Sequence, residues 1–259
     1  MSSTVPTKDA KLETLETTPP EIFPIEEETQ LLTETHTEKA SANKTFASGD
    51  YSPAIQGYEK ALATCPNYLE YDIAVLRSNI AACHIKLSEW KEAVESATQA
   101  LEALDRVDPP RIATKEGEES GHVDEIDDAV EVRLEALTRT GKTLNDVHKL
   151  RTKVLLRRAK ARREVGGWSS FQGSLEDYQT LSKPPNVLTG LDKETVNKAL
   201  REIPIKLDEA KDKEMAEMMG KLKQLGNGLL KPFGLSTDSF KFEKDEKSGN
   251  YSMGMNSGG

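Results

Sequence analysis

The amino-acid sequence has little of what metal centres and disulfide frameworks require. Its 259 residues include only two cysteines, Cys65 and Cys83, and four histidines that lie in four separate contexts. Neither a CxxC pair nor a histidine pair with metal-ligand spacing occurs, so we expect no metal and no other cofactor. Two isolated cysteines are typical of a reducing compartment, the cytosol or the nucleus, and we expect a cytoplasmic protein.

Long apolar runs and catalytic motifs are also absent. Because no stretch of about 18 apolar residues occurs, we expect no membrane insertion. The N-terminus lacks the apolar segment that a signal peptide needs. The sequence contains no nucleophile elbow, phosphate-binding loop or dinucleotide fingerprint. We therefore expect that the protein is not an enzyme.

The net charge has the wrong sign for a protein that binds nucleic acid. Lysine and arginine number 35 against 44 aspartates and glutamates, which gives a net charge of −9. We therefore expect no nucleic-acid partner. Hydrophobic residues make up 36% of the chain, which indicates a small core with much solvated surface, or disordered segments. Residues 1–26, rich in Thr, Pro and Glu, are predicted to be a disordered acidic tail.

A repeated helix–turn–helix pattern occupies the middle of the chain. In the first copy a turn at Ser48-Gly49-Asp50 separates two helices, and Pro66 closes the second. A third, less regular copy has its turn at Gly166-Gly167, and an aromatic residue, Trp168, follows the turn directly. Small and aromatic residues recur on one helix face with spacings of 4 and 3, which predicts closely packed antiparallel helices. These residues are Ala54, Tyr58 and Ala61 in the first copy and Ala93, Ala97 and Ala100 in the second.

This pattern resembles the tetratricopeptide repeat (TPR), a pair of antiparallel helices that stacks into a superhelix. The resemblance implies an all-α fold, a TPR superhelix of three helix pairs with a long C-terminal capping helix and a short extended or hairpin tail. The repeats would lie within residues 27–187, at about 35–68, 74–107 and 143–187. An acidic insertion, 108–142, would contain a mobile loop and a helix over 129–141. Thr143 and Asp146 then form a capping-box pattern, which predicts a helix start.

The C-terminal part is predicted to close the superhelix. Residues 188–230 have helical periodicity with a break expected at Pro204, and residues 231–259 form a tail. Alternating aromatic and methionine residues in the tail predict a hairpin or an extended strand, which would dock on the capping helix, remain disordered or become ordered on a partner. An apolar stripe is predicted to pack as the cap, and it comprises Leu207, Ala210, Met218, Leu222 and Leu225. Met215, Met218 and Met219 are predicted to pack there too, with a client-binding surface as the alternative.

Five polar residues fall on the groove-facing positions of the first helices of the three repeats. Lys39 and Asn43 share a face in the first repeat, Asn79 lies in the second, and Lys153 and Arg157 share a face in the third. They match, one for one, the two-carboxylate clamp of TPR co-chaperones. The lysines and the arginine supply charge and donors, and the asparagines supply neutral amide donors.

The resemblance implies that this clamp binds the Glu-Glu-Val-Asp (EEVD) end of Hsp70 and Hsp90. Lys39, Asn43 and Asn79 would hold the main-chain end, while Lys153 and Arg157 would reach the side-chain and upstream acceptors. The run Glu26-Glu27-Glu28 lies just before the first groove helix, and we expect it to visit the groove and compete weakly.

The C-terminal sequence carries a second resemblance. The string MMGKLKQLGNGLLKPFGLSTDSFKF, followed by SGNYSM, is similar to the end of members of the tetratricopeptide repeat protein 1 family. This resemblance implies a co-chaperone adaptor that binds Hsp90 and/or Hsp70 and links the chaperone to a client. We expect the protein to be a monomer. The alternative is a scaffold or maturation factor for Ras-like or heterotrimeric G proteins, in which the groove is secondary.

Overall fold

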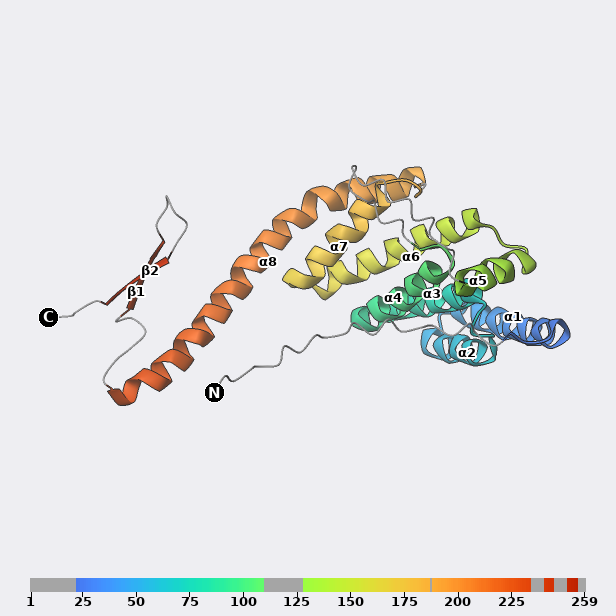
Figure 1. The fold of residues 1–259 in the computed structure, drawn as a ribbon, viewed down its shortest axis with the longest axis horizontal. Coiled ribbons are helices and arrows are strands. Elements are labelled where there is room, and N and C mark those ends of the chain that lie inside the picture. The colour runs from blue at the N-terminus through green and yellow to red at the C-terminus, as the bar shows by residue number, and fades with distance from the viewer. Residues whose placement is uncertain (1–21, 110–127, 187, 234–239, 245–250, 256–259) are drawn as a thin grey trace, which may run out of the picture.

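The computed structural model describes residues 22–109, 128–186, 188–233, 240–244 and 251–255. Within these ranges the chain forms eight α-helices, one short 3-10 helix and one two-stranded antiparallel sheet (Figure 1). The helices are α1 (Ile25–Ala47), α2 (Tyr51–Thr64), α3 (Glu70–Leu87), α4 (Trp90–Val107), α5 (Asp128–Arg139), α6 (Leu144–Val165), α7 (Trp168–Leu181), α8 (Gly190–Leu230) and the 3-10 helix η1 (Lys231–Phe233). The strands are β1 (Phe240–Lys244) and β2 (Tyr251–Met255).

The helices pack as three TPR pairs, which confirms the predicted fold class. Helix α1 packs on α2, α3 on α4, and α6 on α7, while contacts between α2 and α3 and between α4 and α6 join the neighbouring pairs. Helix α5 lies between the second and third pairs in the sequence and contacts α3 and α4. Figure 1 shows the stack running from α1 and α2 to α7 and α8.

Small residues fill the interfaces within the pairs, as their spacing predicts. Gly57 marks the closest approach of α1 and α2, because a Cβ atom placed on it would lie 2.9 Å from the Cβ of Ala42. In the third pair Ser174 stands where alanine is usual, and its hydroxyl donates to the carbonyl of Ala159 at 2.8 Å, so the buried polar group is satisfied. The six predicted interface residues, Ala54, Tyr58, Ala61, Ala93, Ala97 and Ala100, are all buried.

Helix α1 begins earlier than the sequence analysis predicts. Residues 25 and 26 belong to this helix and not to a disordered tail, and residues 1–21 lie outside the described ranges. Glu28 is buried, and its carboxylate accepts two hydrogen bonds from Arg139 of α5, at 2.7 and 3.0 Å. Tyr68 donates a third at 2.8 Å. The predicted visit of the Glu26–Glu28 run to the groove is therefore wrong for Glu28.

The insertion returns to regular structure before the third pair. Helix α5 is followed by Gly141, whose φ of 71° suits a glycine at a helix end. The predicted capping box is confirmed, because the side chains of Thr143 and Asp146 bond each other's backbone N–H groups at the start of α6. Most of the predicted mobile loop, residues 110–127, lies outside the described ranges.

Helix α8 runs unbroken through Pro204, so the predicted break is wrong. A proline inside a helix removes one hydrogen bond and bends the helix without having to end it, and α8 is visibly curved in Figure 1. The first part of α8 is held in place by burial, since Val196, Ala199 and Ile203 pack in one core cluster with Tyr178 and Leu181 of α7.

The second part of α8 does not pack as a cap. Helix α7 has 14 residues and α8 has 41, so α8 continues past the end of its neighbour. Near the start of α7, the backbone N–H of Trp168 donates to Glu214 of α8 at 2.7 Å. Beyond this point the predicted cap packing is wrong, because the apolar side chains are 46–75% exposed. We call these residues the exposed row: Met215, Met218, Met219, Leu222, Leu225 and Leu229.

The predicted C-terminal hairpin is confirmed in its strand pairing. Strands β1 and β2 are antiparallel, with Phe240 opposite Met255 and Lys244 opposite Tyr251. The connecting residues 245–250 lie outside the described ranges. Within the described ranges, no helix is long and apolar enough to cross a bilayer, and no group of acidic, histidine and cysteine side chains is arranged to hold a metal ion.

Candidate functional site

The five predicted clamp residues lie on the first helices of the three pairs. Lys39 and Asn43 are on α1, Asn79 is on α3, and Lys153 and Arg157 are on α6. Asn43 and Lys153 are exposed, and the other three side chains are partly buried. The TPR arrangement thus carries residues more than 110 positions apart in the sequence onto three helices of one stack.

Arg157 is anchored by α3. Its guanidinium donates to the main-chain carbonyl oxygen of Ser78 at 2.6 Å and also to the Ser78 hydroxyl. Burial lowers the pKa of Arg157 from its ordinary value, since the charged form loses solvation. The neighbouring positive charge of Arg157, with burial, lowers the pKa of Lys153. The two cations therefore lie close enough to repel each other, and an anion between them would relieve that repulsion.

Arg157 differs from the other arginines of α6 in having no carboxylate partner among the described residues. Arg151 pairs with Asp105 of α4 and with Asp108, while Arg158 and Arg162 share Asp177 of α7. A partly buried guanidinium without a counter-ion is costly, so such an arrangement is typical of a site that receives an anion. Lys153 likewise has no acidic partner among these residues.

Lys39 is held differently. Its ammonium lies 3.7 Å from a carboxylate oxygen of Asp72, a buried residue near the start of α3. The same oxygen of Asp72 lies 2.9 Å from the Nε2 atom of His36. Part of the Lys39 charge is therefore balanced within the protein before any ligand arrives, and none of the hydrogen bonds or ion pairs of the described residues joins Lys39 to the other four clamp residues.

The two asparagines also differ in their surroundings. The side-chain oxygen of Asn43 accepts a hydrogen bond from the hydroxyl of Tyr58 at 2.7 Å. This bond leaves the amide NH₂ group of Asn43 as the part that a ligand can reach. Asn79 makes no side-chain hydrogen bond with the described residues, although it directly follows Ser78, the anchor of Arg157. The structure thus joins Asn43 to Tyr58, and it joins Arg157 to Ser78, the residue that precedes Asn79.

The sequence analysis missed three residues of this site. Tyr58 is predicted there only as a packing residue, and Ser78 and Asp72 are not singled out. The signals for the last two are weak: Ser78 precedes Asn79 by one position, and Asp72 precedes Asn79 by seven, about two helical turns along α3. Arg158, which directly follows Arg157, lies outside the clamp, because its guanidinium donates to Asp177 of the neighbouring helix α7.

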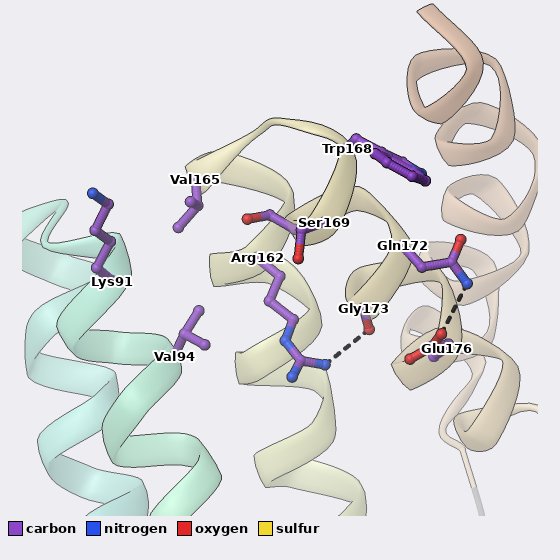
Figure 2. Close-up of a pocket in the computed structure, with 10 residues that line it drawn as sticks. Lys91, Val94, Arg162, Val165, Trp168, Ser169, Gln172, Gly173 and Glu176 are labelled. Carbon is purple, nitrogen blue, oxygen red and sulfur yellow. Dashed lines mark hydrogen bonds between the residues drawn. The ribbon is translucent and has the colours of Figure 1, made fainter. Parts of the chain in front are cut away.

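A hollow of about 780 Å³ lies away from the clamp, between α4, α6 and α7 (Figure 2). Its wall includes Trp168, and none of the five clamp residues lines it. Arg162 reaches this hollow, but its guanidinium is engaged by the carbonyl of Gly173 and by Asp177, both at 2.9 Å. Figure 2 also shows Gln172 bonded to Glu176. The arrangement has no convergent set of free charged groups.

No family model matches the sequence. Among curated proteins, the human mitochondrial import receptor subunit TOM70 is 38% identical over 64 residues, which is 25% of this chain and 10% of the relative. The auxilin-like clathrin uncoating factor SWA2 of Saccharomyces cerevisiae is 29% identical over 146 residues, 56% of this chain and 18% of the relative. Dynein axonemal assembly factor 4 of Rattus norvegicus is 41% identical over 66 residues, which is 26% of this chain and 14% of the relative. The chain therefore spans less than a fifth of the length of these relatives.

Two solved structures are similar to this chain in fold. The second TPR domain of human RPAP3, in complex with the HSP70 peptide SGPTIEEVD, matches with a TM-score of 0.40 and 18% identity over 67% of this chain and 98% of that one. The Hsp90 co-chaperone Cns1 of Saccharomyces cerevisiae matches with a TM-score of 0.43 and 14% identity over 77% of this chain and 47% of that one.

Proposed function

We propose that this protein is a cytoplasmic TPR co-chaperone adaptor of the tetratricopeptide repeat protein 1 family. Its clamp residues, Lys39, Asn43, Asn79, Lys153 and Arg157, would bind the C-terminal EEVD tail of Hsp90 and/or Hsp70 and so link the chaperone to a client. The observation that carries the proposal is the pair Lys153 and Arg157, two neighbouring cations without a carboxylate partner among the described residues.

The chemistry of the ligand fits these donors. A C-terminal aspartate presents two carboxylates, one on the side chain and one on the main chain, at the end of an extended peptide. Charge-assisted hydrogen bonds to carboxylates are about twice as strong as neutral ones. The outward NH₂ group of Asn43 donates without adding a third positive charge beside Lys153 and Arg157. An amidated or extended C-terminus removes one of the two carboxylates.

The alternative function is a scaffold or maturation factor for Ras-like or heterotrimeric G proteins. The exposed row of α8 is the observation that favours a second protein partner, since contiguous exposed apolar side chains mark interaction surfaces. An adaptor needs such a surface as well, so the exposed row does not distinguish the two functions. The dependence of client binding on the clamp residues distinguishes them. Client binding that persists when Lys153 and Arg157 are neutralised would favour the alternative.

The affinity for an EEVD peptide is expected to fall as ionic strength rises. The protein carries a net charge of −9, so long-range forces repel an acidic peptide, while the cations of the clamp attract it at short range. Salt screens exposed charges beyond about 8 Å at physiological strength, so the local attraction decides the sign of the effect. Fluorescence anisotropy of a labelled peptide across a salt series measures it.

A variant with Lys153→Gln serves as the control for this salt series. It should bind more weakly and show a shallower dependence on salt, because one attracting charge is gone. An affinity that instead increases with salt would mean that overall repulsion outweighs the clamp, and would contradict the proposed role of these cations.

A further inference from the structure

Tyr58 reaches the clamp from a helix that carries none of the five clamp residues. It lies on α2, the second helix of the first pair, and its ring is buried among the first two pairs. Its hydroxyl is the atom that contacts the clamp, through the 2.7 Å hydrogen bond to the side-chain oxygen of Asn43. The buried Tyr58 thus contacts the exposed Asn43 side chain from the protein interior.

The charge of Arg157 acts on the same hydroxyl. Burial raises the pKa of Tyr58 to about 12, and the nearby positive charge of Arg157 opposes that rise. The phenol therefore keeps its proton at every physiological pH. The hydrogen bond to Asn43 uses this proton, because the phenol O–H donates to the side-chain oxygen of Asn43. The hydroxyl is then a donor, and only the oxygen of the amide can accept from it.

We propose that Tyr58 is a positioning residue for the clamp, which fixes the amide of Asn43 with its NH₂ group toward the ligand carboxylate. The inference rests on the proposed EEVD-binding function. Without the phenol, the Asn43 side chain would be free to present either its oxygen or its nitrogen. The oxygen would repel the carboxylate, so part of the binding free energy would be lost in ordering the amide at the moment of binding.

A double-mutant cycle tests the inference by calorimetric titration of an EEVD decapeptide. The four proteins are the unmodified chain, Tyr58→Phe, Asn43→Ala and the double variant. Tyr58→Phe keeps the buried ring and should weaken binding about fivefold, the size of one neutral hydrogen bond. In the Asn43→Ala background the same change should have almost no effect, because the amide that Tyr58 orients is gone.

Tyr178→Phe is the matched control. Tyr178 lies on α7, the second helix of the third pair, is as buried as Tyr58, and makes no hydrogen bond through its hydroxyl within the described residues. This variant should bind the peptide like the unmodified chain. An equal loss from Tyr58→Phe in both backgrounds, no loss in either, or the same loss from Tyr178→Phe would overturn the inference while leaving the proposed function in place. Failure of the unmodified chain to bind would overturn both.

Discussion

Replacing Lys153 with glutamate is expected to lower the affinity for an EEVD peptide about a hundredfold. The change removes an unpaired cation beside Arg157 and places a carboxylate where the ligand's carboxylate would lie. Loss of one partner of a hydrogen-bonded charge pair at an interface costs about 2–5 kcal/mol, and about 2.8 kcal/mol corresponds to a hundredfold in affinity. Calorimetric titration of the variant measures the effect, and circular dichroism checks that the helices are retained.

Lys91→Glu is the control for this prediction. Lys91 is exposed on α4, lines the hollow of Figure 2, and changes the net charge by the same amount when reversed. Its reversal should leave peptide affinity nearly unchanged, and an equal loss in both variants would show that only overall charge matters. Lys39 and Arg157 are poorer choices for reversal, because a glutamate there would face buried Asp72 or lose the bonds to Ser78.

Replacing Arg139 with methionine is expected to destabilise the fold by about 3 kcal/mol. The change leaves the Glu28 carboxylate buried with only the Tyr68 hydroxyl as a side-chain donor. Breaking a buried ion pair from one side typically costs about 3–5 kcal/mol, and the partial exposure of Arg139 favours the low end. For a chain of this size, a thermal melt should show a decrease in Tm of roughly 6–12 °C.

The pH dependence of stability separates this ion pair from simple packing. The hydrogen bonds from Arg139 hold the pKa of Glu28 below its ordinary value, against the opposing effect of burial. Its contribution to stability is therefore complete above the pKa of glutamate in the unfolded chain and is lost as the pH falls through the lower folded value. Arg139→Met should lack this acid-sensitive part.

Two control variants complete the stability test. Lys60→Met breaks the exposed pair with Glu38 and should leave Tm almost unchanged. The double replacement Glu28→Leu with Arg139→Leu should recover much of the lost stability, because an apolar pair avoids the stranded charge. A melt of Arg139→Met that matches the unmodified chain would contradict the role assigned to the Glu28–Arg139 pair.

The repeat architecture could be predicted because its signals are local. The spacing of Ala93, Ala97 and Ala100 defines one helix face whatever the rest of the chain does, and all three are buried. The capping box at Thr143 and Asp146 is likewise decided within four residues. Each TPR pair is specified by such short-range patterns, so each pair can be predicted whatever is inserted between it and its neighbour.

The errors arose where long-range contacts decide the outcome. Glu28 is separated from Arg139 by 111 residues, and nothing in the acidic run near the N-terminus indicates that partner. The apolar residues of α8 have the periodicity of a packed face, but α7 is too short to cover those beyond Glu214. The clamp could be predicted in part. The TPR register predicts the positions of its five residues, whereas the contacts that Tyr58, Ser78 and Asp72 make with them depend on how the helices pack.

The most direct test of the proposed function is a pair of calorimetric titrations. A decapeptide that ends in EEVD is titrated into the full chain as the free acid, and the same peptide is then titrated with its C-terminus amidated. The clamp predicts binding of the free acid and a large loss of affinity on amidation, since one of the two carboxylates is gone. Equal binding of both peptides, or binding of neither, would contradict a clamp built from Lys39, Asn43, Asn79, Lys153 and Arg157.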